Sequence, residues 1–168
     1  TSQLALSVLK NYQERITARR ERMENLLNYS FIRTSNKRFD IAMNWSKLSL
    51  DALIMNQVKK GIFAGLPWFD NYWGRDTYIT LPGATLVTGN FSDAKEILKS
   101  FAAWQDTNRN STNYGRIPNL VTTNSIAYNT ADGTPRFVMS LYDYFKYSLD
   151  AEFLLEMYPV VKRSIEGT

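Results

Sequence analysis

The amino-acid sequence predicts an all-α fold of about six helices. Several segments carry apolar residues at steps of three and four, no segment shows a convincing polar–apolar alternation, and glycines occur where helices would end. The chain has 168 residues, of which 44% are apolar, so it can bury the core of one domain or of part of one.

Two helices are expected before the first aromatic motif. The first covers residues 4–29 and carries apolar residues at a spacing of about 3.5. Residues 30–39 form a polar connection, and the second helix begins at Asp40 and ends at Gly61. We therefore divide the chain into an N-terminal linker and packing helix, residues 1–30, and a longer domain, residues 31–168.

Two further helices follow residues 61–74, an irregular stretch that is rich in aromatic side chains. One is expected over residues 76–87, with a kink or break where Pro82 and Gly83 interrupt the pattern. The next begins after Ser92, which is a suitable N-cap. Residues 106–134 have no periodicity and are expected to form a long loop of the kind that is usually functional or disordered.

The fifth and sixth helices, residues 137–145 and residues from 151 onward, carry more apolar residues than one helix face can bury. We expect this surface to be covered by the remainder of the parent domain or by self-association through residues 137–165. The apolar residues are Phe137, Val138, Leu141, Phe145, Phe153, Leu154, Met157 and Ile165.

Composition excludes several kinds of chemistry. The chain has no Cys and no His, which excludes disulfides, thiolate nucleophiles, imidazole bases and His or Cys zinc sites. Its 20 Lys and Arg against 16 Asp and Glu give a net charge of only +4, which favours neither a nucleic-acid partner nor a membrane surface. No apolar run is long enough to span a bilayer. We expect no metal and no cofactor.

The first chemical motif is PWFDNYWGRDT, residues 67–77. Its aromatic rings offer flat apolar faces for a sugar or another ring-shaped ligand. Arg75 and Asp76 follow at an expected helix start, where a guanidinium and a carboxylate suit neighbouring sugar hydroxyls. The alternative is an Arg75–Asp76 ion pair that only fastens the helix start.

The second motif lies in the long loop, in YGRIPNLVTTNSIAYNTADGTP, residues 114–135. Short polar side chains gather there, which is typical of binding loops, although the spacing does not match an EF-hand calcium loop. Asp132 has a second interpretation, as the N-cap of the helix near Pro135.

In this order the motifs PWF, WGRDT, LPG, IPN and YNTAD resemble the glucosidase domain of glycogen debranching enzymes, over residues 39–168. The resemblance implies a fold that is half of an (α/α)6 toroid of helical hairpins. It also implies a cytoplasmic enzyme that hydrolyses α-1,6-linked glucose at the branch points of an α-glucan such as glycogen or limit dextrin. Its inverting mechanism needs two carboxyl groups and no metal. It also implies that the acid and base lie beyond Thr168, so that this segment contains no catalytic residue and is inactive alone. The glucose-binding residues that it implies are Trp73, Arg75, Asp76, Asn119, Tyr128, Asn129 and Asp132.

Other functions remain open at this stage. A glucoamylase- or trehalase-like glycosidase has the same expected fold. A helical carbohydrate-binding module without catalysis is an alternative from another class, and a single-stranded nucleic-acid binder is a third, which strong salt dependence would reveal.

Overall fold

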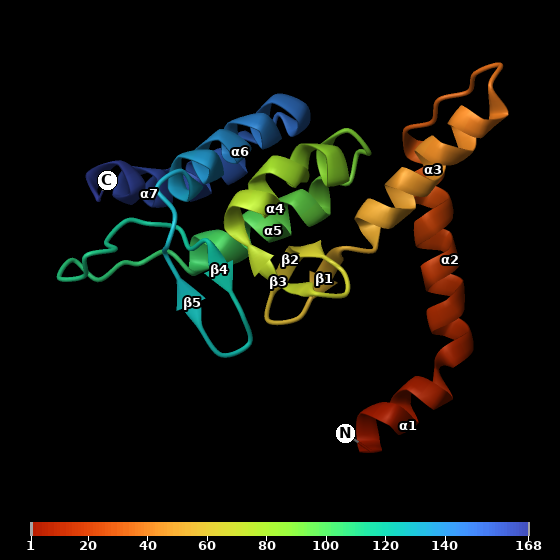
Figure 1. The fold of residues 1–168 in the computed structure, drawn as a ribbon, viewed down its shortest axis with the longest axis horizontal. Helices are drawn as coiled ribbons and strands as arrows, with labels where there is room; N and C mark the ends of the chain where they lie inside the picture. The colour runs from red at the N-terminus through yellow and green to blue at the C-terminus, as the bar shows by residue number, and fades with distance from the viewer. Residues whose placement is uncertain (1, 168) are drawn as a thin grey trace. The chain divides into compact units, whose positions relative to one another are not determined.

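The computed structural model describes residues 2–167 and divides the chain into two compact units, which meet in sequence between Leu48 and Ser49. The first unit contains α1 (Ser2–Lys10), α2 (Tyr12–Tyr29) and most of α3 (Lys37–Asp51) (Figure 1). Most side chains of α2 are exposed, and Leu26 is its buried residue.

The second unit combines one sheet with a group of helices that contact one another and the sheet (Figure 1). The sheet is antiparallel and its five strands follow the order β1-β2-β3-β4-β5. Its strands are β1 (Ile54–Asn56), β2 (Lys60–Gly65), β3 (Phe69–Trp73), β4 (Leu120–Val121) and β5 (Ile126–Ala127). The helical elements are α4 (Gly74–Leu81), the π-helix η1 (Pro82–Leu86), α5 (Phe91–Ala103), α6 (Gly133–Ser148) and α7 (Ala151–Glu166).

The prediction of an all-α fold is wrong, because the second unit contains a five-stranded sheet. The aromatic motif forms a β-hairpin, in which Phe63 of β2 pairs with Tyr72 of β3 and a bulge follows Phe63. Three consecutive residues of β2, residues 61–63, are buried, so the strand lacks the alternation that would have identified it. Strands β4 and β5 have two residues each, too few for any periodicity.

The second expected helix is also shorter than predicted. α3 ends at Asp51, and Ile54 belongs to β1, where it pairs with Ile62. The hydroxyl of Tyr72, a residue with no exposed surface, accepts a hydrogen bond from the N–H of Gln57 (2.8 Å) and donates to the carbonyl of Lys59 (2.7 Å). Contacts with a distant tyrosine therefore fix the turn between β1 and β2, which local periodicity cannot reveal.

The expected break after residue 81 is confirmed, since α4 ends at Leu81 and a π-helix follows from Pro82. The helices pack around an aromatic centre in which the ring of Tyr78 meets Phe101 and Phe137 edge to face, at centroid distances of 5.2 and 5.7 Å. The apolar side chains predicted on the last two helices are partly buried in the core and partly exposed to solvent. Phe137, Leu141, Phe153 and Met157 are buried, whereas Leu154 and Ile165 are exposed.

Candidate functional site

The two motifs meet where β3 ends and α4 begins. Trp73 of β3 pairs with Leu120 of β4, and this pairing places Asn119 beside the first residue of α4. The N–H of Gly74 donates to the backbone carbonyl of Asn119. A Cβ atom at position 74 would lie 2.5 Å from the carbonyl oxygen of Pro118, so only glycine permits this approach of the two backbones.

A hollow of about 310 Å³ lies on the outer side of the β2–β3 hairpin, and its volume is at the lower end of the range for ligand sites, roughly 300–1,000 Å³. Because Tyr72 turns into the core, its neighbour Trp73 faces the other side of the strand. Asp76 comes from the first turn of α4. The residues that line the hollow are Ala64, Phe69, Trp73 and Asp76.

Arg75 and Asp132 connect the two motifs electrostatically. Arg75 Nη1 lies 3.8 Å from Asp132 Oδ1, and Arg136 Nε donates to Asp132 Oδ2 at 2.9 Å. The hydrogen bond from Arg136, with the positive charges of Arg75 and Arg136, lowers the pKa of Asp132 below its usual value, although partial burial opposes the shift. Asp132 stands at the N-cap position of α6, as expected, but its side chain makes no capping hydrogen bond.

Asn119 links three segments. Its Oδ1 accepts from the N–H of Arg75 (3.1 Å), and its Nδ2 donates to Oδ1 of Asn129 (3.1 Å). Its own N–H donates to the carbonyl of Ala127 on β5 (2.9 Å). The residue is buried, so these contacts take place away from solvent.

Tyr128 is directed elsewhere. Its hydroxyl donates to the carbonyl of Trp104 (2.8 Å), and its carbonyl accepts from Arg116 (3.3 Å). Burial, together with the charge of Asp106, raises the pKa of Tyr128. The hydroxyl group of Tyr128 is thus bonded to a residue outside both motifs, away from the hollow.

Three residues of this region were not expected from the sequence. Ala64 gave no chemical signal, and it lies at the bulge between Phe63 and Gly65 of β2. Phe69 belonged to the aromatic cluster but was not distinguished from its neighbours. Arg136 lies four residues after Asp132 on the same helix, a spacing that does predict contact.

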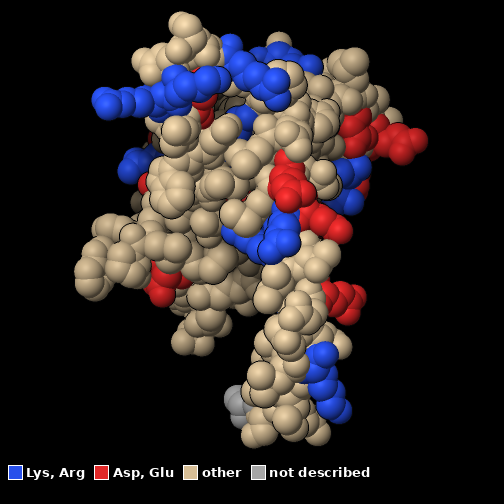
Figure 2. All heavy atoms as spheres, turned by 90° about the vertical axis from the view of Figure 1, so that its right-hand side faces the viewer, with Lys and Arg blue, Asp and Glu red and all other residues tan. Residues whose placement is uncertain are grey.

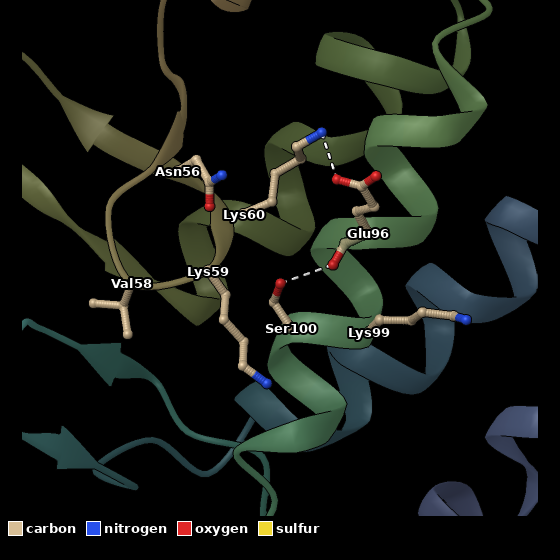
Figure 3. Close-up of a pocket in the computed structure, with 7 residues that line it drawn as sticks. All are labelled: Asn56, Val58, Lys59, Lys60, Glu96, Lys99 and Ser100. Atoms are coloured by element: carbon tan, nitrogen blue, oxygen red, sulfur yellow. Dashed lines mark hydrogen bonds and ion pairs between the residues drawn. The ribbon is translucent and has the colours of Figure 1, made fainter. Parts of the chain in front are cut away.

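A second hollow, of about 340 Å³, lies between the β1–β2 turn and α5 (Figure 3). Lys60 Nζ contacts Asp93 Oδ1 (2.6 Å) and Glu96 Oε2 (2.5 Å) there. Burial lowers the pKa of Lys60, but the hydrogen bonds that its ammonium group donates to the carboxylates of Asp93 and Glu96 outweigh this effect and raise the pKa. The charge of the Lys60 ammonium group is therefore compensated by these two carboxylates.

Charge on the surface is mixed. Figure 2 shows both basic and acidic side chains on the face that it draws. Within residues 2–167, no helix has the length and apolar character needed to cross a bilayer, and no group of three or more carboxylates is placed to bind a metal ion.

The sequence is similar to those of known proteins. A family model described as amylo-alpha-1,6-glucosidase matches residues 28–167. The glycogen debranching enzyme of Saccharomyces cerevisiae is 32% identical over 116 residues, which cover 66% of this chain and 7% of the yeast protein. The chain therefore spans a small part of the length of this relative.

Proposed function

Because the chain belongs to the amylo-alpha-1,6-glucosidase family, we propose that it supplies part of the pocket that binds the terminal glucose during hydrolysis of α-1,6 linkages at branch points of glycogen or limit dextrin. The substrate class follows from the family, which supports a glycoside hydrolase acting on an α-glucan. The observation that supports the pocket role is that Trp73 and Asp76 line one hollow, with Arg75 beside them.

The chemistry of this hollow suits a neutral sugar. The indole of Trp73 and the ring of Phe69 offer apolar faces for the C–H groups of a pyranose. The carboxylate of Asp76 accepts hydrogen bonds from hydroxyl groups, and the guanidinium of Arg75 donates them. A site of this kind fixes the orientation of a glucose residue with few polar groups.

The surroundings of Asp132 do not suit a general acid. A general acid in a glycosidase has a raised pKa, so that it carries a proton at neutral pH. Asp132, by contrast, lies between two arginines that lower its pKa. This argues against an acid role for Asp132. We assign Trp73 and Asp76 to substrate contacts because they line the hollow, and Arg75 because it is the neighbour of Asp76, and we propose that the acid and base are not among the residues of these two motifs.

Titration of the chain with isomaltose and methyl α-glucoside, followed by calorimetry, tests the pocket. We expect Trp73→Ala to weaken binding at least about tenfold, because loss of a stacked aromatic ring costs on the order of 1–3 kcal/mol. Trp45→Ala is the matched control, since Trp45 is exposed and belongs to the other unit. Equal affinities of the two variants would contradict the proposed pocket.

Salt dependence separates a glucan from a polyanion. Binding of a neutral sugar should hardly change between about 50 and 200 mM salt, whereas nucleic-acid binding would fall by orders of magnitude. Release of glucose from a branched limit dextrin by the purified chain would contradict the assignment of its carboxylates to binding.

A further inference from the structure

We infer that Asn119 is a positioning residue, which sets Arg75 and Asp76 in place by capping α4 from a distant segment. The inference rests on the proposed function, because it assumes that Arg75 and Asp76 contact the sugar. It changes the role expected from the sequence, where Asn119 was itself a sugar contact.

The first step concerns the start of α4. The first N–H groups of a helix have no carbonyl partner within the helix, and a polar side chain at the N-cap normally accepts one of them. In this helix the N-cap residue is Trp73, whose indole has no acceptor for this purpose, and no side chain of the cap residue bonds the helix. The sequence therefore leaves the helix without a local cap.

Asn119 supplies the missing acceptors. Its backbone carbonyl accepts from the N–H of Gly74, and its Oδ1 accepts from the N–H of Arg75 at 3.1 Å. Two successive N–H groups of the first turn are thus bonded to one residue that lies 44 positions later in the chain. This contact fixes the direction in which the first turn leaves β3.

The second step concerns the groups that remain for a ligand. Asn119 is 5% exposed, and its Nδ2 already donates to Asn129 Oδ1. Both ends of its amide are engaged within the protein. A sugar in the hollow would meet Asp76 and Trp73, which line it, whereas Asn119 is not among the lining residues.

The third step concerns the consequence for the site. Arg75 and Asp76 occupy adjacent positions and point about 100° apart around the helix axis. With the first turn fixed, Asp76 lines the hollow while Arg75 reaches Asp132 on the other motif. A small rotation of this turn would move both side chains together, so the cap controls the geometry of both contacts.

Two substitutions separate positioning from contact. Asn119→Asp keeps a side-chain acceptor for the N–H of Arg75, and a carboxylate is favourable near a helix N-terminus. Asn119→Ala removes the acceptor but leaves the backbone carbonyl that bonds Gly74. Hydrogen exchange of the Arg75 amide, measured by NMR, reports on the cap without any ligand, and calorimetry with isomaltose reports on binding.

In Asn119→Ala we expect the protection of the Arg75 amide from hydrogen exchange and the affinity for isomaltose each to fall at least about tenfold. The protection of the Gly74 amide should be retained. Asn119→Asp should keep more of the Arg75 protection and of the affinity than Asn119→Ala, because it retains the acceptor for Arg75 although it loses the hydrogen bond that Nδ2 donates to Asn129. Melting curves establish whether each variant folds. If Asn119→Ala does not fold, the affinity and the Arg75 protection of Asn119→Asp still test the inference.

Three results would overturn the inference. Loss of affinity in Asn119→Ala with unchanged Arg75 protection would show that Asn119 contacts the sugar directly, as would loss of affinity in Asn119→Asp with the cap intact. Loss of protection with unchanged affinity would show that the cap only stabilises the helix. A wild-type chain that binds neither isomaltose nor methyl α-glucoside would instead overturn the proposed function, while the exchange measurement would still decide whether the cap exists.

Discussion

Arg75 pairs with Asp132, 57 residues later in the sequence, through a 3.8 Å contact between Nη1 and Oδ1. The sequence left open an ion pair between Arg75 and its neighbour Asp76 that would only fasten the helix start. No contact of this kind between the two is found in the described part of the chain, where Asp76 faces the hollow instead. The pairing with Asp132 therefore leaves the carboxylate of Asp76 available to a ligand.

Asp76→Asn and Asp132→Asn should consequently behave differently. Asp76→Asn should weaken sugar binding strongly with little change in melting temperature, because the carboxylate is exposed and lies in the hollow. Asp132→Asn should lower the melting temperature slightly and affect binding only through the freed Arg75. Calorimetry and thermal melts of both variants test this. A folded Asp76→Asn variant with normal affinity would contradict the site.

Gly74→Ala should destabilise the fold. The new Cβ would lie 2.5 Å from the carbonyl oxygen of Pro118, and relief of this overlap requires the two backbones to separate. Overpacking of this kind costs about 1–3 kcal/mol, although alanine is the better helix former. The matched control is Gly83→Ala, where nothing lies within 4 Å of the added Cβ. In urea unfolding, the midpoint of Gly74→Ala should be clearly lower than that of Gly83→Ala. Equal midpoints would contradict the close approach of residue 74 to Pro118.

Stability should fall in acid partly through Asp150. The hydrogen bond from Lys95 Nζ (2.7 Å), followed by that from the N–H of Phe153 (3.0 Å), lowers the pKa of Asp150 to about 2. A lowered pKa favours the folded state when the carboxyl is ionised, so this contribution is complete above the unfolded value, about pH 4. It is lost as the pH falls from about 4 to about 2.

Thermal melts of wild type and Asp150→Asn between pH 7 and pH 2 measure this effect. We expect the variant to be less stable than wild type at pH 7, and the difference to shrink as the pH approaches 2. Glu152→Gln is the control, because Glu152 is in the same helical turn and outside this network. A constant difference between wild type and Asp150→Asn at every pH would contradict the assignment.

The outer face of α7 should make the isolated chain self-associate. Leu155, Tyr158 and Ile165 lie on one side of the helix and are all more than half exposed. Sedimentation at micromolar concentration should show association, which Leu155→Lys weakens. Leu4→Lys, in the other unit, should leave it unchanged. A wild-type chain that sediments as a monomer at these concentrations would contradict the prediction.

The sequence by itself determined the elements whose signals are local. Apolar spacing located the last two helices, and the Pro82–Gly83 pair located the break after α4, because both depend on residues a few positions apart. The order of motifs was sufficient to place the chain in its family. Because the chain has no Cys and no His, its chemistry is limited to the side chains that the motifs carry.

The tertiary structure decided what depends on distant residues. Strand β2 shows no alternation because neighbouring residues on both of its sides are shielded from solvent. β1 looked like the end of a helix until its pairing with β2 was known. The pairing of β3 with β4 brought Asn119 to α4, and the fold brought Asp132 to Arg75. Such contacts join residues 44 and 57 positions apart, and their geometry is set by backbone pairing rather than by any local pattern in the sequence.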